Sequence, residues 1–167
     1  MQHLAPVPVW QGSAAGSQSA WLTGIAVDVR GDGAGNGPAT SQEGALILLV
    51  EDDLMIGQMY MLGLTSAGYE VTLATDGRQA LEKMRSRRPD LVLLDIRLPQ
   101  MDGLEVLAAV REDHALRSTK IVVFSNFGEQ ETIREAESLG AVEYLNKSSV
   151  TPGELARRLP EWLGEVS

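Results

Sequence analysis

The sequence predicts an α/β protein built on a doubly wound, five-stranded parallel sheet with helices on both faces. Residues 45–50, 91–94 and 121–124 are unbroken apolar runs, and weaker strand-like segments occupy 69–74 and 142–145. Helical patterns fill the intervals between these five segments. Continuous apolar strands that alternate with helices are typical of a parallel sheet covered on both faces.

The helices are recognised by the spacing of their apolar residues. Met55, Met59 and Leu62 recur at i, i+4 and i+7, which predicts a first helix over this stretch. A second set with helical spacing consists of Leu104, Leu107 and Ala108.

The last helix has a start signal in the sequence. Thr151 is expected to be its N-cap, with Pro152 in the first turn and Glu154 at the third position. Pro160 is expected to kink or break this helix before Trp162, because proline lacks the backbone donor and its ring clashes with the preceding turn.

Residues 1–43 differ in composition from the rest of the chain. They are rich in Gly, Ser and Ala and contain few large apolar residues, so we predict a disordered N-terminal tail before a domain over 44–167. The segment WLTGIAVDV, residues 21–29, leaves open a short strand or docking segment. A misassigned upstream start codon would also account for the tail.

Composition excludes several function classes. The formal net charge of −9 argues against a sequence-independent grip on nucleic acid, and Arg85, Arg87 and Arg88 are expected to be the solvated end of a helix. No apolar run approaches the roughly 20 residues that span a bilayer, and no Lys or Arg precedes Arg30, which argues against a secretory signal. The absence of cysteine agrees with a cytoplasmic location.

Polar residues follow four of the predicted strands. They are Glu51, Asp52 and Asp53 after the first, Asp95 after the third, Ser125 at the end of the fourth and Lys147 after the fifth. Because the carboxyl ends of parallel strands lie on one edge of a sheet, these side chains are expected to converge there. Asp53 also fits the N-cap of the helix that follows.

This combination of residue types suits phosphoryl transfer. Clustered carboxylates repel one another, and Mg²⁺, which prefers oxygen ligands, relieves that repulsion. Lys147 offers a compact positive charge and Ser125 a hydroxyl donor for phosphoryl oxygens, so Asp95 has what an attacking carboxylate requires. Each residue alone has an ordinary structural explanation, and the combination at four strand ends carries the hypothesis.

The motifs ILLVEDD, DLVLLDIRLPQMDGLEVL, IVVFSN and AVEYLNK follow one another over about residues 44–166. In order and spacing they resemble the receiver domain of two-component response regulators. Asp95 precedes Ser125 by 30 residues and Lys147 by 52, as in that family. The resemblance implies a flavodoxin-like sheet with strand order 2-1-3-4-5. No output domain follows in this sequence, which favours the stand-alone, single-domain type.

The resemblance also implies a role for each site residue. Asp95 accepts a phosphoryl group from a phosphohistidine, and the protein catalyses only its own phosphorylation and dephosphorylation. Glu51, Asp52 and Asp95 hold Mg²⁺, Asp52 most directly, with the backbone carbonyl of Arg97 as a further ligand. Ser125 and Lys147 contact the transferred phosphoryl group.

Partners follow from the same resemblance. The phosphodonor is a sensor histidine kinase or a histidine phosphotransfer protein. Ser125 and Tyr144 form the switch that changes the face of the fourth helix, fifth strand and fifth helix, and this face contacts a downstream protein or a second copy of the chain. No contact with nucleic acid or membrane is expected.

The sequence departs from the family pattern at several positions. Ser148 follows the lysine where the family usually has proline, and Asn126 replaces a residue that is commonly very small. By resemblance, Arg97 and Phe127 flank the path of the water that hydrolyses the aspartyl-phosphate.

Two other functions remain open. A phosphorylation-independent pseudo-receiver would keep the fold and bind partners without phosphorylation. A haloacid-dehalogenase-like phosphohydrolase is disfavoured because it needs a second aspartate where this chain has Arg97, which does not exchange a proton near neutral pH. A serine hydrolase is weaker still, since His3 and His114 lie in the tail and in a loop.

Overall fold

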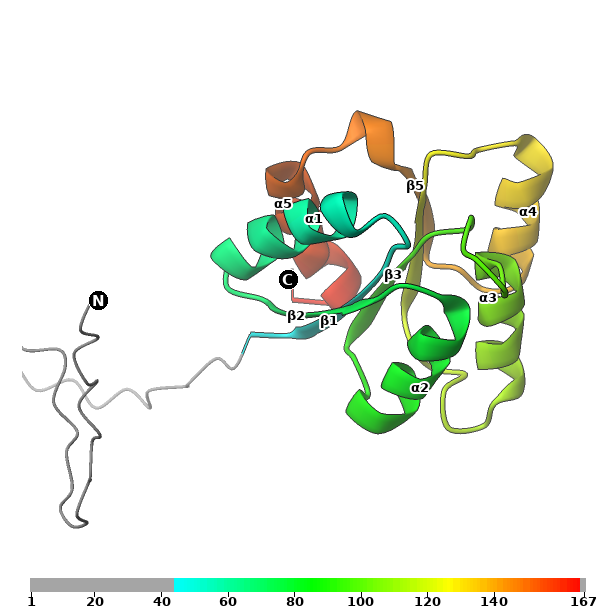
Figure 1. Ribbon diagram of the computed structural model, residues 1–167. Coiled ribbons are helices and arrows are strands. Elements are labelled where there is room, and N and C mark those ends of the chain that lie inside the picture. Colours follow the sequence, from blue (N-terminus) through cyan, green and yellow to red (C-terminus); the bar gives the residue numbers. More distant parts are fainter. Residues whose placement is uncertain (1–43, 166–167) are drawn as a thin grey trace, which may run out of the picture. The chain divides into compact units, whose positions relative to one another are not determined.

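The computed structural model describes residues 44–165, which form a five-stranded parallel sheet between two layers of helices (Figure 1). The strands are β1 (Leu46–Val50), β2 (Glu70–Ala74), β3 (Leu91–Leu94), β4 (Ile121–Ser125) and β5 (Glu143–Asn146). Their order, β2-β1-β3-β4-β5, and their parallel pairing confirm the predicted fold. The predicted tail, including residues 21–29, lies outside the described residues.

Five helices cover the sheet. They are α1 (Leu54–Ser66), α2 (Gly77–Arg87), α3 (Gly103–Glu112), α4 (Gln130–Ser138) and α5 (Pro152–Leu163), and a short 3-10 turn, η1 (Lys147–Ser149), precedes α5. Helices α1 and α5 lie on one face of the sheet, and α2, α3 and α4 lie on the other (Figure 1). No helix within residues 44–165 is long and apolar enough to cross a membrane.

Helix α1 forms where it is predicted, but it buries a different face. Met55, Met59 and Leu62, whose spacing predicted the helix, are 81%, 49% and 70% exposed and do not face the core. The residues that are buried are Gly57, Tyr60 and Leu64. Because α1 is apolar around most of its circumference and contains no charged residue, periodicity could not select the correct face.

Helix α5 begins at the predicted signal. The Thr151 side chain accepts a hydrogen bond from the Glu154 amide, and the Glu154 carboxylate accepts one from the Thr151 amide at 2.8 Å, which completes a capping box. The predicted break at Pro160 is wrong, since the helix continues to Leu163. The last turn is held by the buried Trp162, whose indole N–H donates to the Glu143 carboxylate at 2.9 Å.

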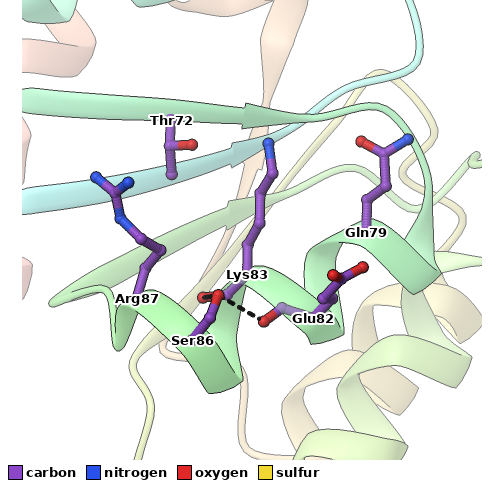
Figure 2. Close-up of a pocket in the computed structure, with 6 residues that line it drawn as sticks. All are labelled: Thr72, Gln79, Glu82, Lys83, Ser86 and Arg87. Carbon is purple, nitrogen blue, oxygen red and sulfur yellow. Dashed lines mark hydrogen bonds between the residues drawn. The ribbon is translucent and has the colours of Figure 1, made fainter.

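The outer edge of β2 is covered by side chains of α2. A groove of about 370 Å³ lies between the two elements (Figure 2). Its lining consists of Thr72, Gln79, Glu82, Lys83, Ser86 and Arg87. The Lys83 ammonium donates to the Leu73 carbonyl, and Arg87 pairs with Glu70 at 2.7 Å. Covering the edge strand of a sheet with a helix is a common protection against pairing with another chain, and the side chains of α2 provide it here.

Helix α3 approaches β3 so closely that only glycine fits at its start. A Cβ at Gly103 would lie 2.2 Å from the Asp95 carbonyl oxygen, whereas a Cβ at Gly153 in α5 would meet no atom within 4 Å. We expect Gly103→Ala to lower the free energy of unfolding by about 2 kcal/mol, because overpacking forces the backbone apart. Gly153→Ala is the control and should raise it by up to about 1 kcal/mol. Urea unfolding followed by circular dichroism measures both, and equal midpoints for Gly103→Ala and the parent would contradict this reading.

Candidate functional site

Four polar side chains from four strand ends meet at the carboxyl edge of the sheet. Glu51 follows β1, Asp95 follows β3, Ser125 ends β4 and Lys147 begins η1 after β5. All four are at most 7% exposed, whereas Asp52, beside Glu51, is exposed. The structure therefore brings the sequence-predicted residues together in a buried polar cluster with an acidic opening to solvent.

Lys147 lies between two carboxylates. Its ammonium donates to Asp95 Oδ2 at 2.5 Å and also pairs with Glu51 Oε2. Burial raises the pKa of Glu51 from its usual range, and the hydrogen bond and charge of Lys147 oppose that rise. A buried charge is costly unless it is paired, so each of these three groups depends on the others.

Hydrogen bonds fix both oxygens of Asp95. Oδ1 accepts from the Ser125 hydroxyl at 2.7 Å and from the Arg97 backbone amide at 3.2 Å, while Oδ2 accepts from Lys147. Two neutral donors and one cation therefore hold the carboxylate in one orientation at the mouth of the site.

Glu51, Asp52 and Asp95 form a cluster whose geometry fits a small divalent cation. Each offers a carboxylate oxygen, and these three oxygens lie within 4.8 Å of one another. Hard oxygen ligands of this kind, one of them open to solvent, suit Mg²⁺, which keeps several waters. Arg97, whose carbonyl is predicted as a further ligand, follows Asp95 by two residues in the same loop, and its role stays a prediction.

Arg97 and Phe127 contact each other beside this cluster. The guanidinium carbon of Arg97 lies 3.9 Å from the centroid of the Phe127 ring, in cation–π geometry. The two residues come from the loops after β3 and β4, and Phe127 is 47% exposed. Together they form a pair of bulky side chains that are exposed at this edge.

Tyr144 of β5 packs in the layer of α4. Its hydroxyl oxygen is buried and has no hydrogen-bond partner among residues 44–165. Burial raises the pKa of this phenol, the nearby Ser125 hydroxyl opposes that rise, and the Asp95 charge adds to it as the smallest cause. An unpaired buried hydroxyl is costly, and the predicted switching role of Tyr144 stays a prediction.

Sequence reasoning missed Tyr60. Its hydroxyl donates to the Val150 carbonyl at 2.8 Å and lies 3.3 Å from the Lys147 carbonyl, while its ring packs edge-on against Phe124. The only signal was a tyrosine in a mostly aliphatic helix, since a buried phenol usually finds a hydrogen-bond partner. Its partners are 87 and 90 residues away, so local pattern could not identify them.

Comparison with known proteins agrees with this geometry. The sequence profile described as "Response regulator receiver domain" matches residues 47–159. The chain belongs to the receiver domain family of response regulators. The polar-differentiation response regulator DivK of Brucella anthropi is 30% identical over 123 residues, which are 72% of this chain and 97% of DivK.

Other receiver proteins match in sequence or in structure. The luminescence regulatory protein LuxO of Vibrio campbellii is 36% identical over 99 residues, 59% of this chain, but the chain spans only 21% of LuxO. The crystal structure of the receiver domain of sensor histidine kinase PA1611 from Pseudomonas aeruginosa superposes with a TM-score of 0.66 at 34% identity, covering 72% of this chain and 98% of that one. PA1611 was crystallised with a magnesium ion coordinated in its active-site cleft.

Proposed function

We propose that this protein is a phosphorylation-dependent switch of a cytoplasmic two-component system, in which Asp95 accepts a phosphoryl group from a phosphohistidine. The observation that carries the proposal is the buried Asp95 carboxylate, held between Lys147 and Ser125 beside two further carboxylates. An Asp95 oxygen forms a bond to phosphorus as the phosphorus–nitrogen bond breaks. The electron pair of that bond stays on the imidazole nitrogen, which then takes up a proton.

The remaining residues receive roles from their positions. Glu51, Asp52 and Asp95, with the Arg97 carbonyl, would hold Mg²⁺, which when bound neutralises charge on the phosphoryl oxygens. The magnesium ion in the cleft of PA1611 supports this assignment. Lys147 and Ser125 would donate to the phosphoryl oxygens after transfer, since both already donate to Asp95.

The test is phosphoryl uptake from a small donor. With acetyl phosphate and Mg²⁺ the parent should gain about 80 Da, while Asp95→Asn should gain nothing because the nucleophilic oxygen is lost. Asp76→Asn, at the N-cap of α2, is the matched control and should gain the same mass as the parent. Intact mass spectrometry reads out all three.

Each outcome points to one function. A parent that gains no mass would favour the pseudo-receiver, which binds partners without phosphorylation. A parent that releases phosphate steadily from small donors would favour a phosphohydrolase. Equal uptake by Asp95→Asn and the parent would show that the acceptor is another residue.

Helix α1 offers a docking surface for the phosphodonor. Four of its apolar side chains are exposed; they are Leu54, Met55, Met59 and Leu62. This stripe begins two residues after Asp52, so a partner covering it would reach the edge where a phosphohistidine must meet Asp95. These four side chains expose an apolar surface of roughly a few hundred Å². A stable dimer buries more, roughly 800 Å² of accessible surface on each partner. A transient complex with an amphipathic helix of the donor therefore fits this surface better than a permanent homodimer.

We expect a charge on this stripe to slow phosphoryl transfer from a protein donor but not from a small-molecule donor. The double variant Met55→Glu/Met59→Glu should accept phosphoryl from its histidine donor at least tenfold more slowly, because burying a charge opposes docking. Its uptake from acetyl phosphate should stay within twofold of the parent. Val142→Glu, at an exposed valine before β5, is the matched control. Equal slowing with both donors would show damage to the site rather than lost docking.

The downstream partner is proposed to contact the face of α4, β5 and α5. Helix α4 is weakly anchored, since it buries only Ala136 and its N-cap residue Glu129 makes no side-chain capping bond. It follows the β4 end that carries Ser125, and the Tyr144 side chain lies beside it. A groove of about 430 Å³ on this face, lined in part by Leu145, Val150 and Arg158, could receive a downstream protein or a second copy.

A further inference from the structure

The loop between β5 and α5 is held to the rest of the domain by a phenol. The Tyr60 hydroxyl of α1 donates to the Val150 carbonyl at 2.8 Å and lies 3.3 Å from the Lys147 carbonyl. We infer that Tyr60 is a positioning residue, which places the Lys147 backbone so that its ammonium reaches both Asp95 and Glu51. This inference rests on the proposed phosphoryl transfer to Asp95.

The other contacts of this loop are local. Asn146 Oδ1 accepts from the Ser148 amide at 2.9 Å and from the Ser148 hydroxyl at 2.6 Å, and the Ser149 hydroxyl donates to the Asn146 carbonyl. These bonds tie η1 to Asn146, the last residue of the adjoining strand β5, and reach no element more distant in the sequence. Within residues 44–165, the bonds of Tyr60 are the hydrogen bonds that join the backbone of 147–150 to an element other than the adjoining end of β5.

Tyr60 is itself rigid, which makes it an effective tether. It is 3% exposed, and its ring meets Phe124 of β4 edge-on, with 4.9 Å between centroids. The Lys147 ammonium lies 5.8 Å from the centroid of the same Phe124 ring. Tyr60, Phe124 and Lys147 therefore form one packed unit, in which the helix α1 fixes the start of η1.

Positioning matters here because a lysine side chain is flexible. Ordering it in one geometry costs up to about 2 kcal/mol of rotamer entropy, and that cost rises if its backbone is also mobile. Misplacement of a catalytic group by about 1 Å can cost as much as 100-fold in rate. Since Tyr60 touches only carbonyls of the loop, its effect on the site must act through Lys147.

The first test removes the hydroxyl and keeps the ring. Tyr60→Phe should lower the rate constant for phosphoryl uptake from acetyl phosphate about tenfold. Tyr69→Phe removes a phenol oxygen from a residue that packs on the same hydrophobic cluster without touching the loop, and it should stay within twofold of the parent. Thermal midpoints are measured first, and rates are compared well below the lowest of them. A Tyr60→Phe protein that matches the parent overturns the inference.

A double-mutant cycle separates positioning from general damage. In a Lys147→Met background, Tyr60→Phe should change uptake less than twofold, because the group it positions is absent. The Mg²⁺ affinity of Tyr60→Phe, measured by calorimetry without phosphodonor, should also stay within twofold of the parent. A tenfold loss that persists in the Lys147→Met background would overturn the inference.

Amide exchange gives a readout that does not need phosphorylation. The backbone amide hydrogens of residues 148–150 should exchange at least tenfold faster in Tyr60→Phe than in Tyr69→Phe. Equal exchange rates in the two variants would overturn the inference that Tyr60 holds the loop. If the parent takes up no phosphoryl group, the proposed function fails, while this exchange result still decides whether Tyr60 holds the loop.

If Tyr60→Phe does not fold, Asn146→Ala loosens the same loop from its exposed side. Slower uptake that disappears in the Lys147→Met background then supports the inference, and unchanged uptake overturns it.

Discussion

Lys147→Met is expected to slow phosphoryl uptake from acetyl phosphate at least 100-fold. The incoming phosphoryl group brings negative charge to a site where Glu51 and Asp95 are already buried. The Lys147 ammonium contacts both of them and is preorganised to meet that charge, which is the kind of contribution worth about 100-fold to 1,000-fold in rate. Methionine keeps the length of the side chain and removes only the charge and its donors.

The matched control is Lys120→Met. The Lys120 ammonium donates to the Leu163 carbonyl at 2.9 Å and lies outside the polar cluster. This variant loses one lysine and one hydrogen bond and should phosphorylate within twofold of the parent. Intact mass followed over time, with saturating Mg²⁺, measures both rates. A Lys147→Met rate within threefold of the parent would mean that this ammonium does not stabilise the transition state.

The same variant should change how stability depends on pH. Burial raises the pKa of Glu51, and Lys147 opposes that rise, so removing Lys147 raises the pKa further. The folded variant then holds a proton that the unfolded chain releases. Its stability relative to the parent is therefore greatest at low pH and is lost as pH rises through the raised pKa. We expect the free energy of unfolding of Lys147→Met to be about 3 kcal/mol below that of the parent at pH 8. At pH 5 the difference should be clearly smaller.

Urea unfolding at the two pH values checks this sign. Added Mg²⁺ should reduce the difference in unfolding free energy between Lys147→Met and the parent at pH 8, because a cation that binds only the folded state stabilises that state. A loss of stability that is equal at both pH values would show that the Glu51 carboxylate does not depend on Lys147 for its charge.

Much of this site could be predicted because strand ends are visible in a sequence. Asp95 and Ser125 each end an apolar run, Lys147 follows the weaker strand-like segment 142–145, and the parallel order then requires them to share one edge. The close contacts were not predictable in the same way. The Arg97–Phe127 pair depends on the paths of two loops, and the Tyr60 tether depends on how α1 is rotated against β4.

In two helices the local pattern did not determine the packing. Periodicity assumes that polar residues mark the exposed face of a helix, and α1 has few polar residues, so the spacing of Met55 and Leu62 predicted the helix but not which face is buried. Local propensity predicted a kink or break of α5 at Pro160, but the helix continues to Leu163, and burial of Leu159 and Trp162 holds its last turn. In both helices tertiary packing decided what local pattern could not.

A long-lived phosphorylated state is the second large effect that we expect. Hydrolysis of an aspartyl-phosphate requires a water in line with phosphorus, and Arg97 and Phe127 lie beside that approach by resemblance to the family. The structure shows them stacked, with the guanidinium 3.9 Å from the ring centroid, so each side chain holds the other in place. Neither can act as a general base, and Arg97 can pair with a phosphoryl oxygen. We therefore expect the stacked pair to exclude water without offering any group that would activate it.

Arg97→Asn/Phe127→Glu should shorten the lifetime of the phosphorylated protein about tenfold or more. The change opens the approach and introduces a carboxylate able to orient or deprotonate a water, and general base catalysis alone is worth about 100-fold or more. Gln130→Glu adds the same charge three residues further along, at the exposed start of α4, and should leave the lifetime unchanged. Decay of radiolabelled phosphoprotein after removal of the donor measures all three. A double variant that decays no faster than the parent would show that the stacked pair does not guard Asp95, and Asn126, whose amide can itself orient a water, would be the next residue to substitute.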